Sequence, residues 1–564
     1  MSEADKERAM TNNFTITRRT TLAGISAAAA AAVLPRAAAA TGSLFQHGVA
    51  SGDPDATSVV LWTRVNAAAP LAVEWELAAD SKFARIVQRG VVQTGPDRDF
   101  TVKALAEGLT QGGRYYYRFR AMGALSPVGR TRTLPVGKLE RLGIALASCS
   151  NFAFGFFNAY DAIARDQAID FVLHTGDYIY EYGADSWGGD VAKRIGRVHQ
   201  PANEIVSLYD YRTRHAQYKT DAGSQAMLAA KPLLACWDDH ESANNPWVGG
   251  AQNHQPDKEG DWAARREASI RAYFEWMPVR EPGAGRSRMQ FWRTYAFGDL
   301  ATLSTLETRH SGRAEQIDYM PFSKTIASHA DALAMERDLI GAPGRMMLAP
   351  ELEADLGAAW TRSKELGQPW RLIGNPMPIA RTRVPDVVSL GLIPDPAGQD
   401  KPSFAAQALA WKGKWNLPLS PDTWDGYEWA RERLYAQARA AGADDLVFLT
   451  GDSHSFWANR LADAAGRSAG IELGTAGISS PGDFIESGFD PVTAGKLDAA
   501  FAEHNPEVVW TDNLHQGYVR LVLGRTGAIA SFVAVNTVLS TRYRSQVIRR
   551  FGITRGAGGL ELNG

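Results

Sequence analysis

The sequence predicts an α/β protein, an αββα sandwich preceded by a small all-β domain of the immunoglobulin or fibronectin kind. Two observations support this prediction. Short stretches rich in β-branched and aromatic residues fill the chain from residue 44 to about residue 135, and Gly and Asp turn signals separate them. Beyond them, apolar runs of strand length alternate with amphipathic stretches of helical period, a pattern typical of sheets layered with helices.

The first segment, residues 1–40, is predicted to be a targeting signal. Arg18 and Arg19 precede an apolar stretch at residues 22–34, and alanines 37–40 supply small residues for cleavage. The paired arginines indicate a twin-arginine signal peptide. A transmembrane helix would need about 20 apolar residues, more than this stretch contains. We therefore expect export by the twin-arginine machinery to the periplasm or the medium, without stable membrane insertion.

The length and composition of the chain limit its possible domain organisation and partners. The 564 residues exceed one ordinary domain, and we expect a β-sandwich domain at 41–136 and a catalytic domain at 137–555. The net charge of −2, from 62 acidic and 60 basic side chains, gives no indication of specific nucleic-acid binding. An exported protein could join its two cysteines, Cys149 and Cys236, in a disulfide. Because both lie at or near predicted strand ends, we favour a metal thiolate for Cys149 and a core residue for Cys236.

The expected elements follow in chain order. In the β domain, a packing module without a catalytic constellation, strands are expected at 58–65, 71–77 and 114–120. In the second domain helices are expected at 160–168, 208–228 and 261–275, strands at 288–297, 300–306 and 370–375, and a late hairpin at 517–523 and 528–535. Loops are expected at 181–203 and 381–419, the second crossing the surface. The tail at 542–555 is expected to form a closing helix, with disorder beyond residue 556.

Four further apolar runs end in side chains that suit a metal. The runs are residues 142–148, 170–175, 232–236 and 446–450. The side chains at or just after their ends are Cys149, then Asp177 and Tyr180, then Asp238, Asp239, His240 and Glu241, and finally Asp452 and His454. Because functional groups in open α/β sheets gather at the carboxyl ends of strands, these groups are expected to form one metal centre.

The donor types indicate two kinds of ion. Cys149, Tyr180 and His454 suit a transition metal, and a tyrosine binds as phenolate only to a strong Lewis acid such as ferric iron. Asp177, Asp239, Asp452 and Asn375 supply the oxygen donors that Ca²⁺ or Mg²⁺ prefers. Asp177 is placed to bridge both ions. His240, beside Asp239, is the candidate general acid.

These motifs carry a family resemblance. Residues 176–181 (GDYIYE), 237–241 (WDDHE) and 451–454 (GDSH) together resemble the calcineurin-like metallophosphoesterases, in particular the PhoD-type alkaline phosphatases. Residues 45–54 and 61–64 look like that family's N-terminal domain. The resemblance extends from about residue 44 to about residue 535, and the order of the motifs along one chain makes it specific.

The resemblance implies a metallophosphoesterase sandwich that holds Fe³⁺ and Ca²⁺. It assigns Fe³⁺ to Cys149, Asp177, Tyr180 and His454, and Ca²⁺ to Asp177, Asp239, Asn375 and Asp452. Asn375 precedes a proline where family members usually have glutamine. Arg309 is a candidate phosphate contact, since a guanidinium can pair with two phosphate oxygens, and a salt bridge is the alternative for it.

The implied function is hydrolysis of phosphomonoesters and phosphodiesters, small or polymeric, by a metal-bound hydroxide, for phosphate acquisition. One alternative is a phospholipase D-like phosphodiesterase acting on phospholipid head groups. Another is an exported protein without catalysis whose Asp and His residues hold structural calcium. Cys, Tyr and His together are poor calcium ligands, which disfavours the last.

Overall fold

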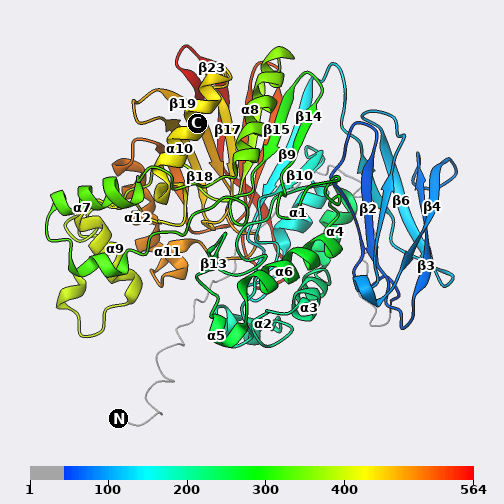
Figure 1. Cartoon of the computed structure of the whole chain (residues 1–564), viewed down its shortest axis with the longest axis horizontal. Coiled ribbons are helices and arrows are strands. Elements are labelled where there is room, and N and C mark those ends of the chain that lie inside the picture. Colours follow the sequence, from blue (N-terminus) through cyan, green and yellow to red (C-terminus); the bar gives the residue numbers. More distant parts are fainter. Residues whose placement is uncertain (1–42) are drawn as a thin grey trace, which may run out of the picture. The chain divides into compact units, whose positions relative to one another are not determined.

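Two mixed sheets stack face to face and carry helices on their outer faces in the computed structural model, which describes residues 43–564 (Figure 1). The predicted signal segment, residues 1–40, lies outside the described residues. The α/β class expected from the sequence is confirmed. No helix between residues 43 and 564 combines the length and the apolar character needed to cross a bilayer.

The larger sheet has ten strands. In spatial order they are β24 (Gly559–Asn563), β23 (Ser545–Gly556), β22 (Ala528–Val535), β21 (Gln516–Gly524), β9 (Arg141–Ala147), β10 (Phe171–His174), β11 (Leu233–Ala235), β1 (Val49–Gly52), β2 (Val59–Arg64) and β5 (Thr101–Ala106). β9, β10 and β11 are parallel neighbours, and His174 pairs in register with Ala147 and Ala235. Three of the four predicted metal-binding loops therefore start from the same edge of this sheet.

The second sheet has seven strands. Their spatial order is β14 (Thr294–Phe297), β15 (Ala301–Thr305), β16 (Trp370–Asn375), β17 (Leu446–Thr450), β19 (Ser468–Gly474), β18 (Phe456–Ala462) and β20 (Val508–Asp512). β15, β16, β17 and β19 are parallel, so the fourth metal-binding loop also leaves a carboxyl end. A two-stranded ribbon of β12 (Pro246–Trp247) and β13 (Gly250–Ala251) follows the third loop.

Because successive side chains of a strand point to opposite faces of its sheet, the apolar core lies in separate layers on the two faces. In β10, Phe171 and Leu173 face the core between the two sheets, and Val172 faces the helices. The helices on the outer face of the larger sheet are α1 (Asn158–Arg165), α3 (Leu208–Tyr218), α4 (Ala222–Ala230) and α6 (Trp262–Trp276). Those on the outer face of the smaller sheet are α8 (Pro350–Glu365) and α10 (Glu428–Ala440).

Six further helices lie in the connecting segments. They are α2 (Gly189–Ile195), α5 (Pro256–Glu259), α7 (His329–Met335), α9 (Phe404–Lys414), α11 (Asp483–Glu486) and α12 (Pro491–His504). α2 and α9 occupy the segments 181–203 and 381–419, which the sequence predicts as loops. Those two predictions are therefore wrong in part. Both helices are short, of seven and eleven residues, so the helical period is repeated only two or three times in the sequence.

The N-terminal strands share their hydrogen bonding with the larger sheet. A third sheet, of β4 (Ile86–Thr94), β3 (Leu71–Ala78), β6 (Arg114–Ala121), β7 (Ala124–Leu125) and β8 (Gly129–Arg132), shares an apolar core with β1, β2 and β5. β1 in turn pairs with β11 through Gly52 and Leu233. A Cβ on Gly52 would lie 2.6 Å from the carbonyl oxygen of Pro278, so only glycine allows this approach. The strands predicted at 58–65, 71–77 and 114–120 are confirmed.

The end of the chain corrects one prediction. The predicted helix at 542–555 is the strand β23, and the predicted disorder beyond residue 556 is the strand β24. Phe551 and Ile553 alternate with exposed residues and pack into the core between the sheets. The basic residues that suggested a helix lie on the solvent side. The predicted strand at 288–297 is also shorter, since β14 begins only at Thr294.

One buried lysine lies between the N-terminal strands and the helices. Lys219, at the end of α3, donates to Tyr178 Oη at 3.0 Å and lies over the rings of Trp62 and Tyr178. Among the described residues, its ammonium group contacts Tyr178, Met277 and Trp62 and forms no ion pair with a carboxylate. Burial lowers the pKa of Lys219 to about 7.

We predict that Lys219→Met makes the protein more stable at pH 7 to 8 and flattens the dependence of stability on pH. The folded pKa lies below the unfolded value of 10.5, so between about pH 7 and pH 10.5 the unfolded chain binds the extra proton. The free energy of unfolding therefore rises with pH in this window because of Lys219. Urea unfolding at several pH values measures the slope. The exposed Lys258→Met is the control, and an unchanged slope in Lys219→Met would contradict the prediction.

Candidate metal centre

The four predicted metal-binding loops meet at one end of the paired sheets. Cys149, Asp177, Asp452 and His454 all have positive φ angles, between 52° and 65°. This left-handed conformation costs a residue with a side chain about 1–2 kcal/mol. Strain of this kind persists where the surrounding structure enforces it and is concentrated at functional sites. Four such residues in one place indicate that the loops are held for the direction of their side chains.

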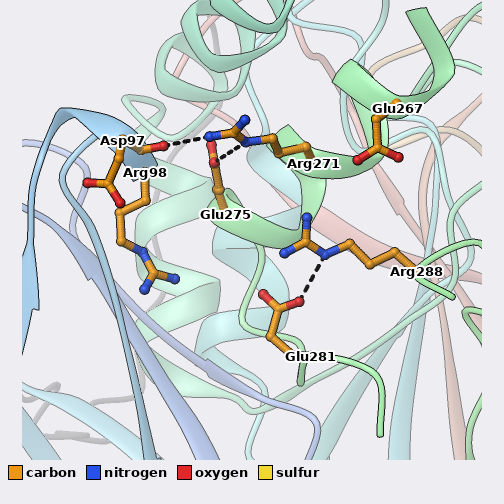
Figure 2. Close-up of a pocket in the computed structure, with 7 residues that line it drawn as sticks. All are labelled: Asp97, Arg98, Glu267, Arg271, Glu275, Glu281 and Arg288. Atoms are coloured by element: carbon orange, nitrogen blue, oxygen red, sulfur yellow. Dashed lines mark hydrogen bonds and ion pairs between the residues drawn. The ribbon is translucent and has the colours of Figure 1, made fainter. Parts of the chain in front are cut away.

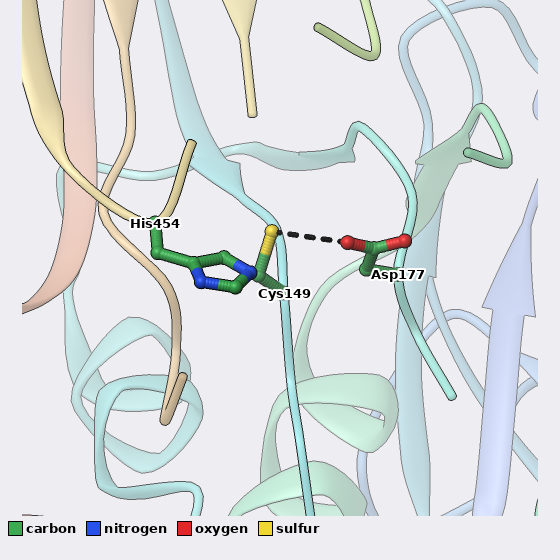
Figure 3. Close-up of side chains that lie close together, drawn as sticks. All are labelled: Cys149, Asp177 and His454. Atoms are coloured by element: carbon green, nitrogen blue, oxygen red, sulfur yellow. Dashed lines mark hydrogen bonds between the residues drawn. The ribbon is translucent and has the colours of Figure 1, made fainter. Parts of the chain in front are cut away.

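The first group combines sulfur, oxygen and nitrogen donors. Ligand atoms of Cys149, Asp177 and His454 all lie within 4.8 Å of one another (Figure 3). Tyr180 Oη is 3.1 Å from Asp177 Oδ2 and 3.1 Å from His454 Nε2. The structure thus brings together all four residues predicted to bind iron. Burial, with Asp177 adding to it, raises the pKa of the Cys149 thiol and of the Tyr180 phenol well above their ordinary values.

The remaining groups are mainly carboxylates. Asp177, Asp239 and His240 form a second set within 4.8 Å, and Asp238, Asp239 and Asp452 form a third. Asp177 is shared by the first and second sets, and Asp239 by the second and third. Burial and then the charge of Asp239 raise the pKa of Asp177 well above its usual range, and burial and the charge of Asp238 do so for Asp452.

These carboxylates fit cations. Asp238 Oδ2 and Asp239 Oδ1 are buried and have no hydrogen-bond partner among residues 43–564. Buried oxygens without a partner are rare and call for an explanation. Oxygen donors around Asp239 and Asp452 suit a hard divalent ion, and the sulfur, phenol and imidazole around Asp177 suit a transition metal. Neither cysteine is in a disulfide, as expected, and Cys236 is a buried core residue.

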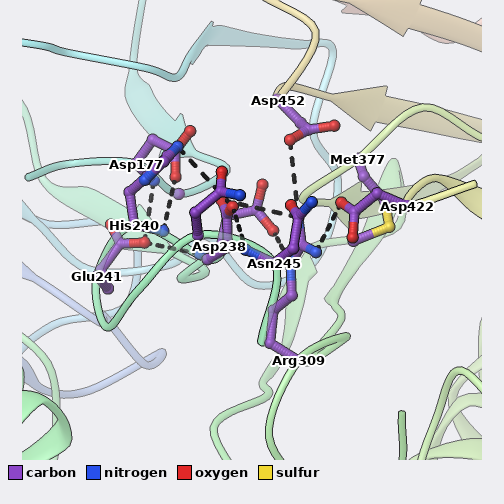
Figure 4. A network of polar contacts seen from close by, with 12 residues as sticks. Asp177, Asp238, His240, Glu241, Asn245, Arg309, Met377, Asp422 and Asp452 are labelled. Carbon is purple, nitrogen blue, oxygen red and sulfur yellow. Dashed lines mark hydrogen bonds and ion pairs between the residues drawn. The ribbon is translucent and has the colours of Figure 1, made fainter. Parts of the chain in front are cut away.

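Arg309 lies among the carboxylates. It is fully buried, and its Nε donates to Asp238 Oδ1 at 2.5 Å and its Nη1 to Asp422 Oδ2 at 2.8 Å (Figure 4). Its Nη2 lies 3.7 Å from Asp239 Oδ1 and 3.6 Å from Asp452 Oδ1. The salt-bridge alternative for Arg309 is therefore what the structure contains. Its contact with a phosphate stays a prediction.

Asn375 is the one predicted ligand whose side chain forms no hydrogen bond or ion pair with a residue of the cluster. It is fully buried at the end of β16. Its side-chain nitrogen donates to the Met377 carbonyl at 2.6 Å, and its oxygen accepts from Trp424 Nε1 at 3.2 Å. Its assignment to calcium stays a prediction.

The sequence groups Glu241 with the side chains of the expected metal centre but assigns it no individual role. Its carboxylate accepts the backbone N–H groups of Asp177 at 3.0 Å, Tyr178 at 2.6 Å and Asp238 at 2.8 Å. One buried side chain thus ties the loop after β10 to the loop after β11. This contact fixes the spacing of Asp177 and Asp239.

Glu181 is the second residue without a predicted role, and it orients His240. Its Oε2 lies 2.7 Å from His240 Nδ1, and its Oε1 accepts from Asn244 N and Asn253 Nδ2, each at 2.8 Å. Burial opposes the charge of both partners. The nearby carboxylates, Asp239 first and then Glu181, nevertheless raise the pKa of His240 well above its usual value. The charge of His240 in turn holds the pKa of Glu181 below its usual range.

The structure also has a cavity that is lined by charged residues and lies away from the metal cluster. It measures about 550 Å³ and lies between a turn of the N-terminal domain and α6 (Figure 2). Its lining residues are Asp97, Arg98, Glu267, Arg271, Glu275, Glu281 and Arg288. Arg271 pairs with Glu275 and Arg288 with Glu281, each at 3.0 Å. None of the lining residues is a predicted site residue.

Comparison with known proteins gives concordant matches. Residues 144–532 match the family of PhoD-like phosphatases, and residues 27–135 match the PhoD-like phosphatase N-terminal domain. The chain is 32% identical over 506 residues to alkaline phosphatase D of Bacillus subtilis (strain 168), covering 84% of this chain and 75% of that protein. A solved structure of PhoD superposes with a TM-score of 0.73 at 28% identity, covering 93% of this chain and 92% of the other.

We predict that Glu241→Gln weakens metal binding about 10- to 100-fold, the usual effect of losing a group that orients ligands. A glutamine offers one acceptor oxygen and turns an amide toward three N–H donors, so the two loops lose their common anchor. Titration with a competing chelator measures the affinity. Glu507→Gln is the matched control, because Glu507 is also buried and accepts the backbone N–H groups of Arg381 and Ala462. Equal affinities in the two variants would contradict the role of Glu241.

Proposed function

The chain belongs to the family of PhoD-like phosphatases, and on this premise we propose that it is an exported, metal-dependent hydrolase of phosphomonoesters and phosphodiesters that serves phosphate acquisition. That it is a phosphoric ester hydrolase follows from the family itself. The observation that supports the finer proposal is the meeting of Cys149, Asp177, Tyr180 and His454 beside an aspartate cluster. Export is inferred from the paired arginines and the apolar stretch at the start of the sequence.

We assign the two ions by donor chemistry. Fe³⁺ is assigned to Cys149, Asp177, Tyr180 and His454, because a thiol and a phenol with raised pKa values ionise only for a strong Lewis acid. Ca²⁺ is assigned to Asp177, Asp239 and Asp452, with Asn375 as the expected fourth ligand. When bound, such a pair supplies the Lewis acidity that orients a phosphate ester, activates water and offsets charge on the attacking and leaving oxygens.

The residues of the chain supply the proton for the leaving group. His240 Nδ1 donates its hydrogen to Glu181, and Nε2 lies 3.8 Å from Asp239 Oδ2, on the side of the cluster. Because the charge of Glu181 favours the protonated imidazole, Nε2 is the atom that would give its hydrogen to the departing alkoxide. Glu181 is the positioning residue in this pair. Arg309 keeps Asp238 and Asp422 in place and offsets part of their charge.

We predict that the loss caused by His240→Asn depends on the leaving group. Removing a general acid costs about 10²- to 10⁴-fold, and the cost grows with the basicity of the leaving oxygen. The variant should therefore lose more kcat on glycerol phosphate than on p-nitrophenyl phosphate. The exposed His504→Asn serves as control. Equal losses on both esters would contradict the role of His240.

The same assay tests the substrate class. The wild-type protein is expected to hydrolyse p-nitrophenyl phosphate and bis-p-nitrophenyl phosphate. Release of head groups from phosphatidylcholine in preference to both would instead identify the phospholipase D-like alternative. Failure to hydrolyse any of the three would refute the proposed function.

We predict that the purified protein absorbs visible light and that Tyr180→Phe abolishes or shifts this absorption. A phenolate and a thiolate on ferric iron give charge-transfer bands, whereas calcium gives none. Tyr178→Phe is the matched control, because Tyr178 is buried two residues away and its hydroxyl contacts Ser224 and Lys219 instead of the cluster. A colourless, fully active protein that contains zinc alone would refute the ferric assignment.

A further inference from the structure

Trp187 spans the two sides of the candidate metal centre. Its ring is close to parallel with that of His240, with centroids 6.1 Å apart and planes at 21°, and with that of His454, at 5.8 Å and 17°. His240 follows β11 of the larger sheet, and His454 follows β17 of the smaller one. Tyr180 lies 5.3 Å away, centroid to centroid. Trp187 thus contacts the candidate general acid and two candidate iron ligands.

The loop around Trp187 holds the ring in this position. Phe154 meets it edge to face at 4.8 Å, and Tyr182 does so at 5.4 Å. The next residue, Gly188, has φ +84°, and a Cβ there would lie 3.0 Å from the Phe154 ring. The Ala184 N–H also donates to the Ala202 carbonyl at 2.8 Å. Trp187 is therefore held in place by the rings of Phe154 and Tyr182 and by the backbone of its own loop.

The indole also carries an unused donor. Trp187 is partly exposed, but its Nε1 is buried and has no hydrogen-bond partner among residues 43–564. Buried N–H groups are usually paired. An indole donates and does not accept, so the missing partner must be an acceptor, and the ester phosphate brings oxygens to this end of the sheets. In the described part of the chain the buried Nε1 atoms of Trp262, Trp276, Trp360 and Trp411 also have no partner, so the position between the two imidazoles is what distinguishes Trp187.

We propose that Trp187 binds the substrate, with its Nε1–H donating to a phosphoryl oxygen of the ester. This inference rests on the proposed function, since it requires a phosphate ester at the cluster. A hydrogen bond to a charged oxygen is stronger than one between neutral groups, so a single N–H contributes measurably to phosphate binding. The ring serves as one wall beside His240 and His454. The ligand class is an inorganic or esterified phosphate.

Trp187→Phe tests the proposal, because it keeps an aromatic ring and removes the N–H donor together with the five-membered ring of the indole. We expect the inhibition constant of inorganic phosphate to rise about tenfold, and kcat/KM for p-nitrophenyl phosphate to fall by a similar factor. Metal content and visible absorption should equal those of the wild type, which separates a substrate contact from damage to the centre. Trp411→Phe is the matched control and should change neither constant.

The outcomes are distinguishable. If the wild-type protein binds phosphate and hydrolyses the ester, and Trp187→Phe has the same constants, the proposal for Trp187 is refuted while the proposed function stands. If the metal content of Trp187→Phe falls, Trp187 is a structural residue of the centre, which also overturns the proposal. If the wild type neither binds phosphate nor hydrolyses any ester, the proposed function itself fails.

Discussion

Repulsion among buried carboxylates is the constraint on which this structure depends. Five aspartates surround one region, and their partners are two arginines and a histidine. These residues are Asp177, Asp238, Asp239, Asp422 and Asp452, with Arg309, Arg313 and His240. Uncompensated buried charge is expensive, so such a site is stable only if cations enter it or protons neutralise it. A phosphate ester is itself an anion, and this cluster would repel it. Cations that enter the cluster would therefore both stabilise the fold and allow an anionic substrate to bind.

The backbone holds these carboxylates close together in two ways, by strained conformations at single residues and by hydrogen bonds between separate loops. Cys149, Asp177, Asp452 and His454 adopt left-handed conformations at the ends of strands whose registers are fixed by several neighbours. Glu241 then joins two of the loops through three backbone N–H groups. A rigid pair of sheets can hold strained tips that an isolated loop could not. The candidate ligands come from four distant segments because parallel strands bring the loops after their carboxyl ends to one end of the sheets.

The sequence predicted the strands of the parallel core and most of the side chains that cluster at their ends, because a short apolar run followed by Asp, Cys or His is a local signal. The individual roles of Glu181 and Glu241 have no local signal, since they consist of contacts with segments about 60 residues away. Arg309 could not be resolved between phosphate and carboxylate, because either partner suits a guanidinium. The tail was predicted wrongly because only two of its apolar residues, Phe551 and Ile553, show the alternation of a strand, whereas the arginines around them are typical of an exposed helix.

The corrected tail also bears on how the site is covered. Gly559, at the start of β24, lies against Ser468 at the beginning of β19. Beyond the opposite end of β19, Ile478 donates its N–H to the Ser148 carbonyl, beside the metal cluster. Because a strand rises about 3.3 Å per residue, the seven residues of β19 separate the turn of the C-terminal hairpin from the cluster by roughly 20 Å. The turn of the hairpin therefore lies at the far end of the sheets, whereas the loop that carries Trp187 borders the site.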